Sequence, residues 1–410
     1  MLYFILICSV SLINPFFGLI FGGVMQFISK KYNLLYTLLF VIVLAIPALF
    51  FIPDVTMDAS RYFYAMKIFN PYNTFKNLWL FISGNFGTYV QYKAYPLSIW
   101  IMYVISKTSR YTLLSFITVL IGYFCTLRPF VDHFWRENKN EENRNRDRWF
   151  TIFAFLVVFF LNHYLFYMSV FRYYLGVSLF ILVLYYDDIA KKKIYLLWYI
   201  PIILIHPGIL FFVVCRFLVP LFKKISLVKI MLIIFSGSIL LTIGNYIDKL
   251  NVSYLSYIYT KFKSYATQGG VLETVTTNSK IIEIIQVVSI LVYLFIFLLE
   301  YLHFNNKKPF QKPLYVTTLL LAIFVLAFIP YNDMFIRYGG VIVILMLIFY
   351  VREFSRFNNI EKIVVITNLC ALMILGGWIN KDIIGVNFGA SPLSYLFISV
   401  FEIIQRIPIY

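Results

Sequence analysis

Long apolar runs separated by short polar segments dominate the hydrophobic pattern of this chain. A membrane-spanning helix needs about 20 consecutive apolar residues. Runs of about that length fall at 3–28, 34–52, 109–127, 149–167, 170–186, 226–247, 281–303, 313–330, 338–352 and 361–378. The pattern predicts an all-α polytopic membrane protein of about 10–14 transmembrane helices. We expect residues 1–410 to form a single transmembrane helical domain.

Three further stretches are apolar but irregular. Residues 194–222 are interrupted at His206-Pro207-Gly208. Proline removes a backbone donor and glycine loosens a helix, so this stretch predicts two half-helices that form a hairpin. The stretches 78–106 and 393–405 are too short or interrupted for simple spans, which favours interfacial or re-entrant segments.

The distribution of basic residues predicts which segments face the cytoplasm. Cytoplasmic loops are enriched in Lys and Arg. If Lys30-Lys31 is cytoplasmic, the N-terminus lies outside, and the segments after it alternate between the two sides of the membrane. This alternation assumes that 194–222 forms a hairpin, which returns the chain to the side from which it entered. The segments that then fall inside, together with Lys30-Lys31, carry 21 of the 35 Lys and Arg residues; they are 128–148, 187–193, 216–229, 303–312 and 352–362. This orientation predicts a cytoplasmic loop at about 128–148 and outer loops at about 53–108 and 248–280.

Composition narrows the class of protein. With 61% hydrophobic and 13% charged residues, the chain is unlike soluble domains. The net charge of +17 is divided among short clusters between apolar runs, so we expect no binding of nucleic acid. The four cysteines are solitary, and no spacing indicates a metal or another cofactor. Nucleotide-binding loops and hydrolase motifs are also missing, so any reaction must use energy stored in its substrate or in a gradient.

Two polar residues stand out on the predicted outer side. Arg172 lies at the join of two apolar runs. A charged side chain near membrane depth costs about 2.5–3.5 kcal/mol on insertion scales, so it usually faces a cavity and a partner. Extension of the arginine to the interface is the structural alternative. His206 lies at the tip of the predicted hairpin, where free helix ends can meet a ligand; elsewhere a lone histidine is more often structural.

Two further groups fall on the same predicted side. Arg337 opens a helix, and its structural alternative is an i,i+4 ion pair with Asp333. Asp58, Arg61 and Tyr62 follow the second apolar run. Asp58 can act as a general base and Arg61 can bind an anion, or both can be ordinary loop polarity.

Aromatic residues fill the two predicted outer loops. They include Tyr62, Tyr64, Tyr72, Phe86, Tyr89, Tyr92, Tyr95 and Trp100 in the first, and Tyr254, Tyr257, Tyr259 and Tyr265 in the second. Flat amphipathic rings stack on sugars, but they also form belts at membrane interfaces. Beside arginines, whose planar guanidinium binds two phosphate oxygens at once, they indicate a polyanionic, sugar-bearing, lipid-anchored ligand.

Several short motifs together resemble a known family. Ser169-Val170-Phe171-Arg172-Tyr173-Tyr174-Leu175, the basic turn Lys191-Lys192-Lys193 and Ile205-His206-Pro207-Gly208-Ile209-Leu210 resemble the central block of the EpsG-like and Wzy polysaccharide polymerases. Asp58-Ala59-Ser60-Arg61-Tyr62-Phe63 and Ile336-Arg337-Tyr338 are similar to its other motifs. The chain departs from the family at Tyr173, often a glutamine, and at Gly208, often a serine.

The resemblance implies a metal-independent glycosyltransferase with a fold similar to the GT-C enzymes, in the bacterial inner membrane. It would move a glycan en bloc from undecaprenyl diphosphate onto a new lipid-linked repeat unit at the outer face. We expect Arg172, Arg337, Arg61, Tyr62 and Tyr173 to bind the substrate. We expect His206 or Asp58 to deprotonate the acceptor hydroxyl, with His206 preferred because imidazole titrates near neutrality. The implied partners, besides membrane lipid, are a flippase and chain-length regulator proteins.

Two other classes of function stay open. A glycan ligase or a membrane O-acyltransferase would use similar chemistry with a different acceptor. A flippase or transporter of lipid-linked glycan would bind the same ligand without changing it. Transporters often contain inverted repeats, and the sequence shows none.

Overall fold

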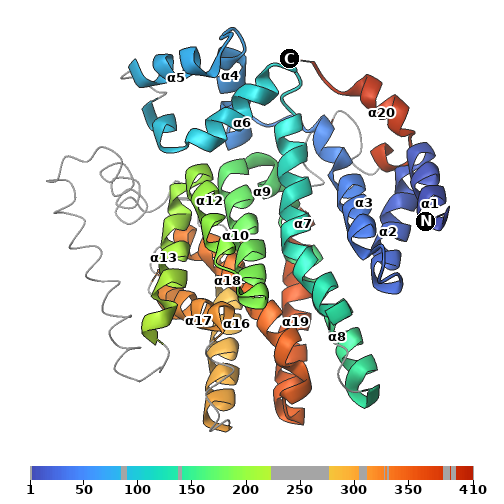
Figure 1. Cartoon of the computed structure of the whole chain (residues 1–410), viewed down its shortest axis with the longest axis vertical. Helices are drawn as coiled ribbons and strands as arrows, with labels where there is room; N and C mark the ends of the chain where they lie inside the picture. Colours follow the sequence, from blue (N-terminus) through green and yellow to red (C-terminus); the bar gives the residue numbers. More distant parts are fainter. Residues whose placement is uncertain are drawn as a thin grey trace, which may run out of the picture. The chain divides into compact units, whose positions relative to one another are not determined.

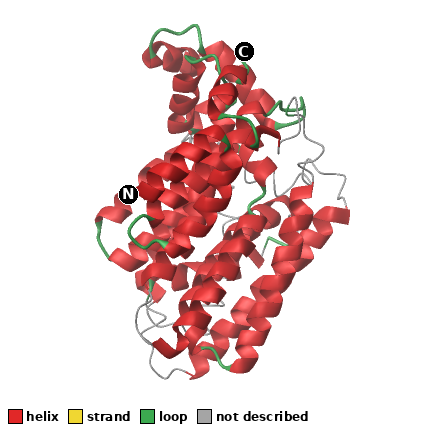
Figure 2. Cartoon of the chain, turned by 90° about the vertical axis from the view of Figure 1, so that its right-hand side faces the viewer, coloured by secondary structure: helices red, strands yellow, loops and turns green. Residues whose placement is uncertain are grey.

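The computed structural model describes residues 2–84, 90–136, 141–222, 277–303, 312–326, 328–329, 332–381, 388 and 394–409. Within these ranges the chain consists of helices and connecting turns, and it has no strand (Figures 1 and 2). The all-α prediction is therefore confirmed. The predicted run 226–247 and nearly all of the predicted outer loop 248–280 lie outside the described residues.

The N-terminal half of the chain holds α1 (Leu2–Ile13), α2 (Pro15–Ile28), α3 (Asn33–Ala45), α4 (Asp58–Phe69), α5 (Phe75–Gly84), α6 (Pro96–Ser106), α7 (Leu113–Arg136), α8 (Glu141–Leu161), α9 (Tyr164–Ser169) and α10 (Phe171–Ala190). The later α-helices are α11 (Ile194–Leu197), α12 (Tyr199–Ile205), α13 (Leu210–Leu218), α16 (Thr277–His303), α17 (Pro313–Leu326), α18 (Asn332–Glu353), α19 (Asn359–Asn380) and α20 (Val400–Arg406). Short 3-10 helices are η1 (Ile46–Phe50), η2 (Val90–Ala94), η3 (Pro207–Ile209), η4 (Val219–Phe222), η7 (Phe354–Arg356) and η9 (Ser394–Leu396).

Six helical segments among the described residues are long and apolar enough to cross a membrane. They are Asn33–Phe50, Leu113–Arg136, Phe171–Ala190, Lys280–Glu300, Phe335–Arg356 and Asn359–Asn380. All six coincide with apolar runs predicted from the sequence. The chain is therefore a multi-pass helical membrane protein.

The first apolar run, 3–28, is two helices and not one span. Asn14 ends α1 and caps α2, since its side chain accepts a hydrogen bond from the Phe16 amide and Pro15 begins the new helix. The two helices, of 12 and 14 residues, pack on each other, and a Cβ on Gly18 would lie 2.7 Å from Ser11 Oγ. Phe4 in turn lies 5.3 Å from the Tyr36 ring, so α1 runs back alongside α2.

The segment 128–148, predicted to be a cytoplasmic loop, is helical over most of its described residues. Helix α7 continues to Arg136, and α8 begins at Glu141. Asp132 lies 3.7 Å from Arg128 and 2.5 Å from Arg136, both at i,i+4 spacing, and these pairs favour the extra helical turns. Arg128, near the end of α7, is buried.

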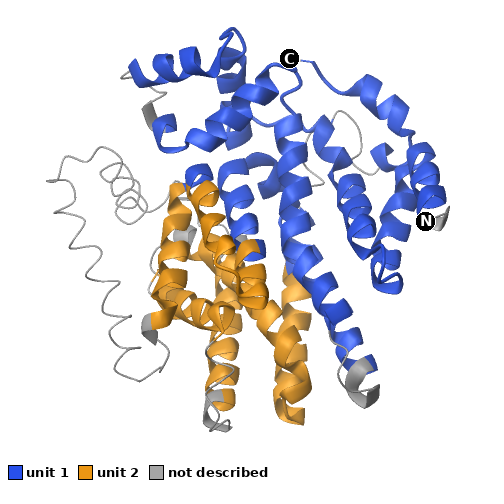
Figure 3. Ribbon diagram, viewed as in Figure 1, with its two compact units in different colours: residues 1–182, 204–206, 376–410 blue, residues 183–203, 207–375 orange. Residues whose placement is uncertain are grey.

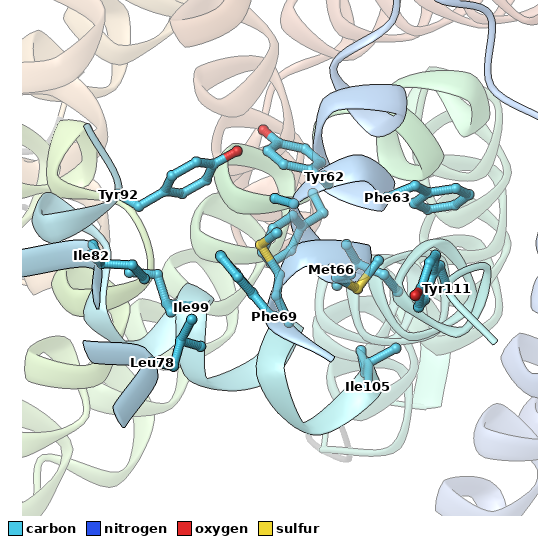
Figure 4. Packing of buried hydrophobic residues seen from close by; sticks show 14 of the residues in the cluster. Tyr62, Phe63, Met66, Phe69, Leu78, Ile82, Tyr92, Ile99, Ile105 and Tyr111 are labelled. Atoms are coloured by element: carbon cyan, nitrogen blue, oxygen red, sulfur yellow. The ribbon is translucent and has the colours of Figure 1, made fainter. Parts of the chain in front are cut away.

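The predicted outer loop 53–108 is also largely helical. Helices α4, α5 and α6 pack around one apolar cluster whose centre is fully buried, at Met66, Phe69, Leu78, Ile82, Ile99 and Met102 (Figure 4). Phe171 and Leu175 from α10 and Ile205 from the end of α12 belong to the same cluster. The segment therefore forms a packed layer that contacts α10 and residue 205.

The described helices fall into two compact units (Figure 3). The first holds residues 1–182, 204–206 and 376–410, and the second holds 183–203 and 207–375. Residues 204–206 thus belong with the first unit, although their neighbours in sequence belong with the second. The expectation of a single transmembrane domain stays a prediction.

Candidate functional site

Arg172 is the second residue of α10, directly after a break in the helical chain. Helix α9 ends at Ser169, and Val170 separates it from α10. A residue of α7 stabilises this break: Ser115 Oγ donates a 2.9 Å hydrogen bond to the Met168 carbonyl. The guanidinium is thereby carried on the start of a fixed helix.

Three tyrosine rings surround the Arg172 guanidinium. Its Cζ lies 4.0 Å from the centroid of Tyr95, 5.0 Å from Tyr62 and 5.6 Å from Tyr92. Tyr62 comes from α4, Tyr92 from η2, and Tyr95 is the residue before α6; all three are buried. A cation over aromatic faces is stabilised by about 2 kcal/mol when it is desolvated. The predicted outer segment therefore supplies the immediate surroundings of Arg172.

The hydrogen bonds of Arg172 leave part of the guanidinium unused. Nε donates to the Tyr62 hydroxyl at 3.2 Å, whereas Nη1 is buried without a hydrogen-bond partner. No ion pair joins Arg172 to a carboxylate in the described part of the chain. A buried unpaired donor costs about 1–3 kcal/mol, more when it is charged. An acidic ligand would satisfy both this donor and the uncompensated charge.

Tyr62 complements Arg172 as a neutral hydrogen-bond donor. Burial raises the pKa of its phenol to about 12, and the nearby positive charge of Arg172 opposes this only in part. At neutral pH the oxygen accepts from Arg172 Nε while the phenol keeps its proton. In Figure 4 the hydroxyl ends of Tyr62 and Tyr92 point toward one another. Tyr62 thus offers a neutral O–H donor next to the guanidinium.

The predicted helix break at His206 is confirmed. Helix α12 ends at Ile205, η3 spans Pro207–Ile209, and α13 begins at Leu210. Whether the two halves form a membrane hairpin stays a prediction. The His206 ring lies 5.7 Å from Tyr95 and 5.6 Å from Tyr173 between ring centroids. One tyrosine, Tyr95, therefore contacts both Arg172 and His206.

The other residues predicted in this region are arranged less tightly. Tyr173 is buried with its ring edge-on to His206. Asp58 and Arg61 form an exposed ion pair of 3.4 Å at the start of α4, while Tyr62, next along the helix, is buried in the core. The structure brings Arg172, Tyr62, Tyr173 and His206 into one group. It places Asp58 and Arg61 on the exposed side of α4.

Arg337 lies in the second unit and is half-buried in α18. The helix is held there by Gln286, whose Nε2 donates to the Ile336 carbonyl at 3.3 Å. Gly339 permits this approach, since a Cβ on it would lie 2.7 Å from Gln286 Oε1. The side chain of Asp333, the expected ion-pair partner, lies outside the described residues. An approach of Arg337 to the Arg172 group stays a prediction.

Two features of the structure are not evident from the sequence. Tyr92 and Tyr95 were expected only as members of an aromatic set, and their contacts single them out. The second unit also holds a buried ionic cluster: Arg352 contacts Asp188 at 2.5 Å, and Arg216 contacts Asp187 at 2.6 Å. The adjacent acidic residues Asp187 and Asp188, at the end of the apolar helix α10, are the sequence feature that could have indicated this cluster.

No family model, curated protein or solved structure matches this chain. Within the described residues no group of three or more His, Cys, Asp or Glu side chains is arranged to hold a metal ion. The chemistry of the group at Arg172 therefore has to be inferred from its own atoms: a cation with a spare donor, neutral phenols and an imidazole.

Proposed function

We propose that the chain is a polymerase of lipid-linked polysaccharide repeat units, acting at the outer face of the bacterial inner membrane. The observation that carries this proposal is Arg172, a half-buried cation surrounded by tyrosines, whose buried Nη1 has no hydrogen-bond partner. Such a site suits a phosphate group, which accepts charge-assisted hydrogen bonds from arginine. The resemblance of the chain's motifs to the EpsG-like and Wzy polymerases implies the other parts of the proposal: the polymerase reaction, its location and a fold similar to the GT-C enzymes.

In this mechanism Arg172 and Tyr62 bind the diphosphate of the glycan donor, undecaprenyl-diphosphate-linked oligosaccharide. The hydroxyl of the acceptor repeat unit attacks the anomeric carbon, and the bond from that carbon to the diphosphate oxygen breaks. His206 takes the hydroxyl proton, and undecaprenyl diphosphate leaves with the negative charge that Arg172 stabilises. Electrostatic stabilisation of developing charge is commonly the largest catalytic term. Asp58 is the alternative base, while Arg61 and Arg337 are further candidate phosphate contacts.

The first test is the variant Arg172→Ala in cells that make a lipid-linked glycan for the enzyme. We expect single repeat units to stay on their carrier with no polymer, because the diphosphate loses its charge partner. The glycan length distribution measured on gels reads this out. Arg406→Ala is the control, since Arg406 is exposed and pairs with Glu402 on α20. A wild-type ladder from Arg172→Ala would remove Arg172 from the mechanism.

A second experiment separates a polymerase from a flippase or transporter. Purified protein in vesicles is incubated with a lipid-linked oligosaccharide, and both product length and the leaflet of the lipid are measured. A polymerase lengthens the glycan, whereas a transporter only moves it. A glycan ligase or an O-acyltransferase would instead require an added acceptor or acyl donor.

A further inference from the structure

His206 lies where the helical run is interrupted. Helix α12 ends one residue earlier, and Pro207 has no N–H with which to continue the helical hydrogen bonds. The short helix η3 that follows has only three residues. Contacts from elsewhere in the chain, from Tyr95 and Tyr173, also reach the imidazole.

Ser98 makes such a contact at the residue before His206. Its Oγ donates a 2.8 Å hydrogen bond to the Ile205 carbonyl, and both residues are buried. Ser98 lies in the first turn of α6, three residues after Tyr95. The same turn therefore carries the hydroxyl that holds residue 205 and the ring that faces His206.

This hydrogen bond leads away from the helix that carries Ser98. Ser106, equally buried on the same helix, donates its hydroxyl to the Tyr103 carbonyl of α6 itself, at 2.7 Å. Such local bonds are the common pattern for serine in helices. At the first turn of α6 the earlier carbonyls are not yet helical, so the Ser98 hydroxyl is directed outward. Residues 204–206 belong to the same compact unit as α6.

We propose that Ser98 is a positioning residue for His206. By holding the Ile205 carbonyl, it keeps the imidazole in contact with the rings of Tyr95 and Tyr173, and Tyr95 also contacts the Arg172 guanidinium. Ser98 acts only through His206 and touches no reacting atom. The role in catalysis rests on the function proposed above, whereas the placement of the imidazole does not.

The placement is tested by the reactivity of His206 in the purified full-length protein. The chain has only four histidines, so modification by diethyl pyrocarbonate can be followed at each by mass spectrometry. In Ser98→Ala we expect His206 to react about fivefold faster, a change equivalent to one lost hydrogen bond. Ser106→Ala is the matched control and Ser98→Thr, which keeps the hydroxyl, should restore the slow rate. Equal His206 rates in Ser98→Ala and Ser106→Ala would overturn the proposal.

The link to catalysis is tested by a double-mutant cycle on glycan elongation. Ser98→Ala alone should slow elongation about fivefold, and it should cause no further loss when His206 is already glutamine. A multiplied loss in the double variant would show that Ser98 acts independently of His206. A wild-type protein that elongates no lipid-linked glycan would remove the proposed function, and the modification rates would still decide the placement of His206.

Discussion

Two regions of this protein bury arginines in opposite ways. In the second unit Arg352 and Arg216 are each paired with a carboxylate, Asp188 and Asp187. Asp188 also accepts a 3.2 Å hydrogen bond from the backbone N–H of Leu314. In the first unit Arg172 has tyrosine rings and one phenol oxygen as its partners.

The difference separates a structural charge from one that is open to a ligand. A buried ion pair is internally neutral, and breaking it costs more than its net contribution to stability. Aromatic rings stabilise a cation without neutralising it, so Arg172 keeps its charge for an incoming anion. The first arrangement joins helices, and the second is suited to binding.

The largest expected effect comes from removing a carboxylate of the ionic cluster. Asp188→Ala leaves Arg352 as an uncompensated buried charge and the Leu314 amide without its acceptor, so we expect a loss of about 3–5 kcal/mol in stability. The measurement is unfolding of the purified protein in detergent. Combining Asp188→Leu with Arg352→Met should recover most of the loss. Glu402→Ala, which breaks an exposed pair, should change stability by about 1 kcal/mol or less.

The next effect concerns the ring nearest to the Arg172 guanidinium. Tyr95→Leu removes the aromatic face at 4.0 Å, so we expect elongation to fall roughly 30-fold, the equivalent of a cation–π contact of about 2 kcal/mol. Tyr95→Phe keeps that face and should stay close to wild type. The exposed Tyr64 on the same outer segment provides the control Tyr64→Leu. Equal losses in the Phe and Leu variants of Tyr95 would instead assign the effect to its hydroxyl.

A smaller effect is expected from the phenol oxygen that accepts from Arg172. Tyr62→Phe removes this acceptor and a donor to the ligand, and elongation should fall about tenfold. Because burial raises the pKa of Tyr62 to about 12, the phenol stays neutral well above neutrality. The ratio of wild-type to variant rates should therefore be constant from about pH 6 to about pH 9. A ratio that changes within this range would mean that the phenolate is the active form.

The sequence predicts the spans well because the hydrocarbon layer demands long apolar runs, and α3, α10, α16, α18 and α19 follow from that demand alone. It predicts the first run poorly. Asn14-Pro15 is a helix-start signal, but the residues on both sides are apolar, so hydropathy alone merges α1 and α2.

For the candidate site, the sequence singles out Arg172 and His206 because each interrupts an apolar stretch, and the structure gathers them around one ring. It could not single out that ring. Tyr95 is one of 33 tyrosines, and its contacts with Arg172 and His206 join segments far apart along the chain. Periodicity and spacing report local geometry and carry no information on such long-range pairs.

The reversal of the chain at Asn14 changes the predicted location of the N-terminus relative to the membrane. Phe4 near the beginning of α1 packs against Tyr32 and Tyr36 at the start of α3, so this end of α1 lies next to the segment that carries Lys30 and Lys31. The N-terminus is then cytoplasmic if those lysines are, contrary to the outside location expected for a single first span. A reporter fused there would mark the cytoplasmic surface, and every later span would keep its direction.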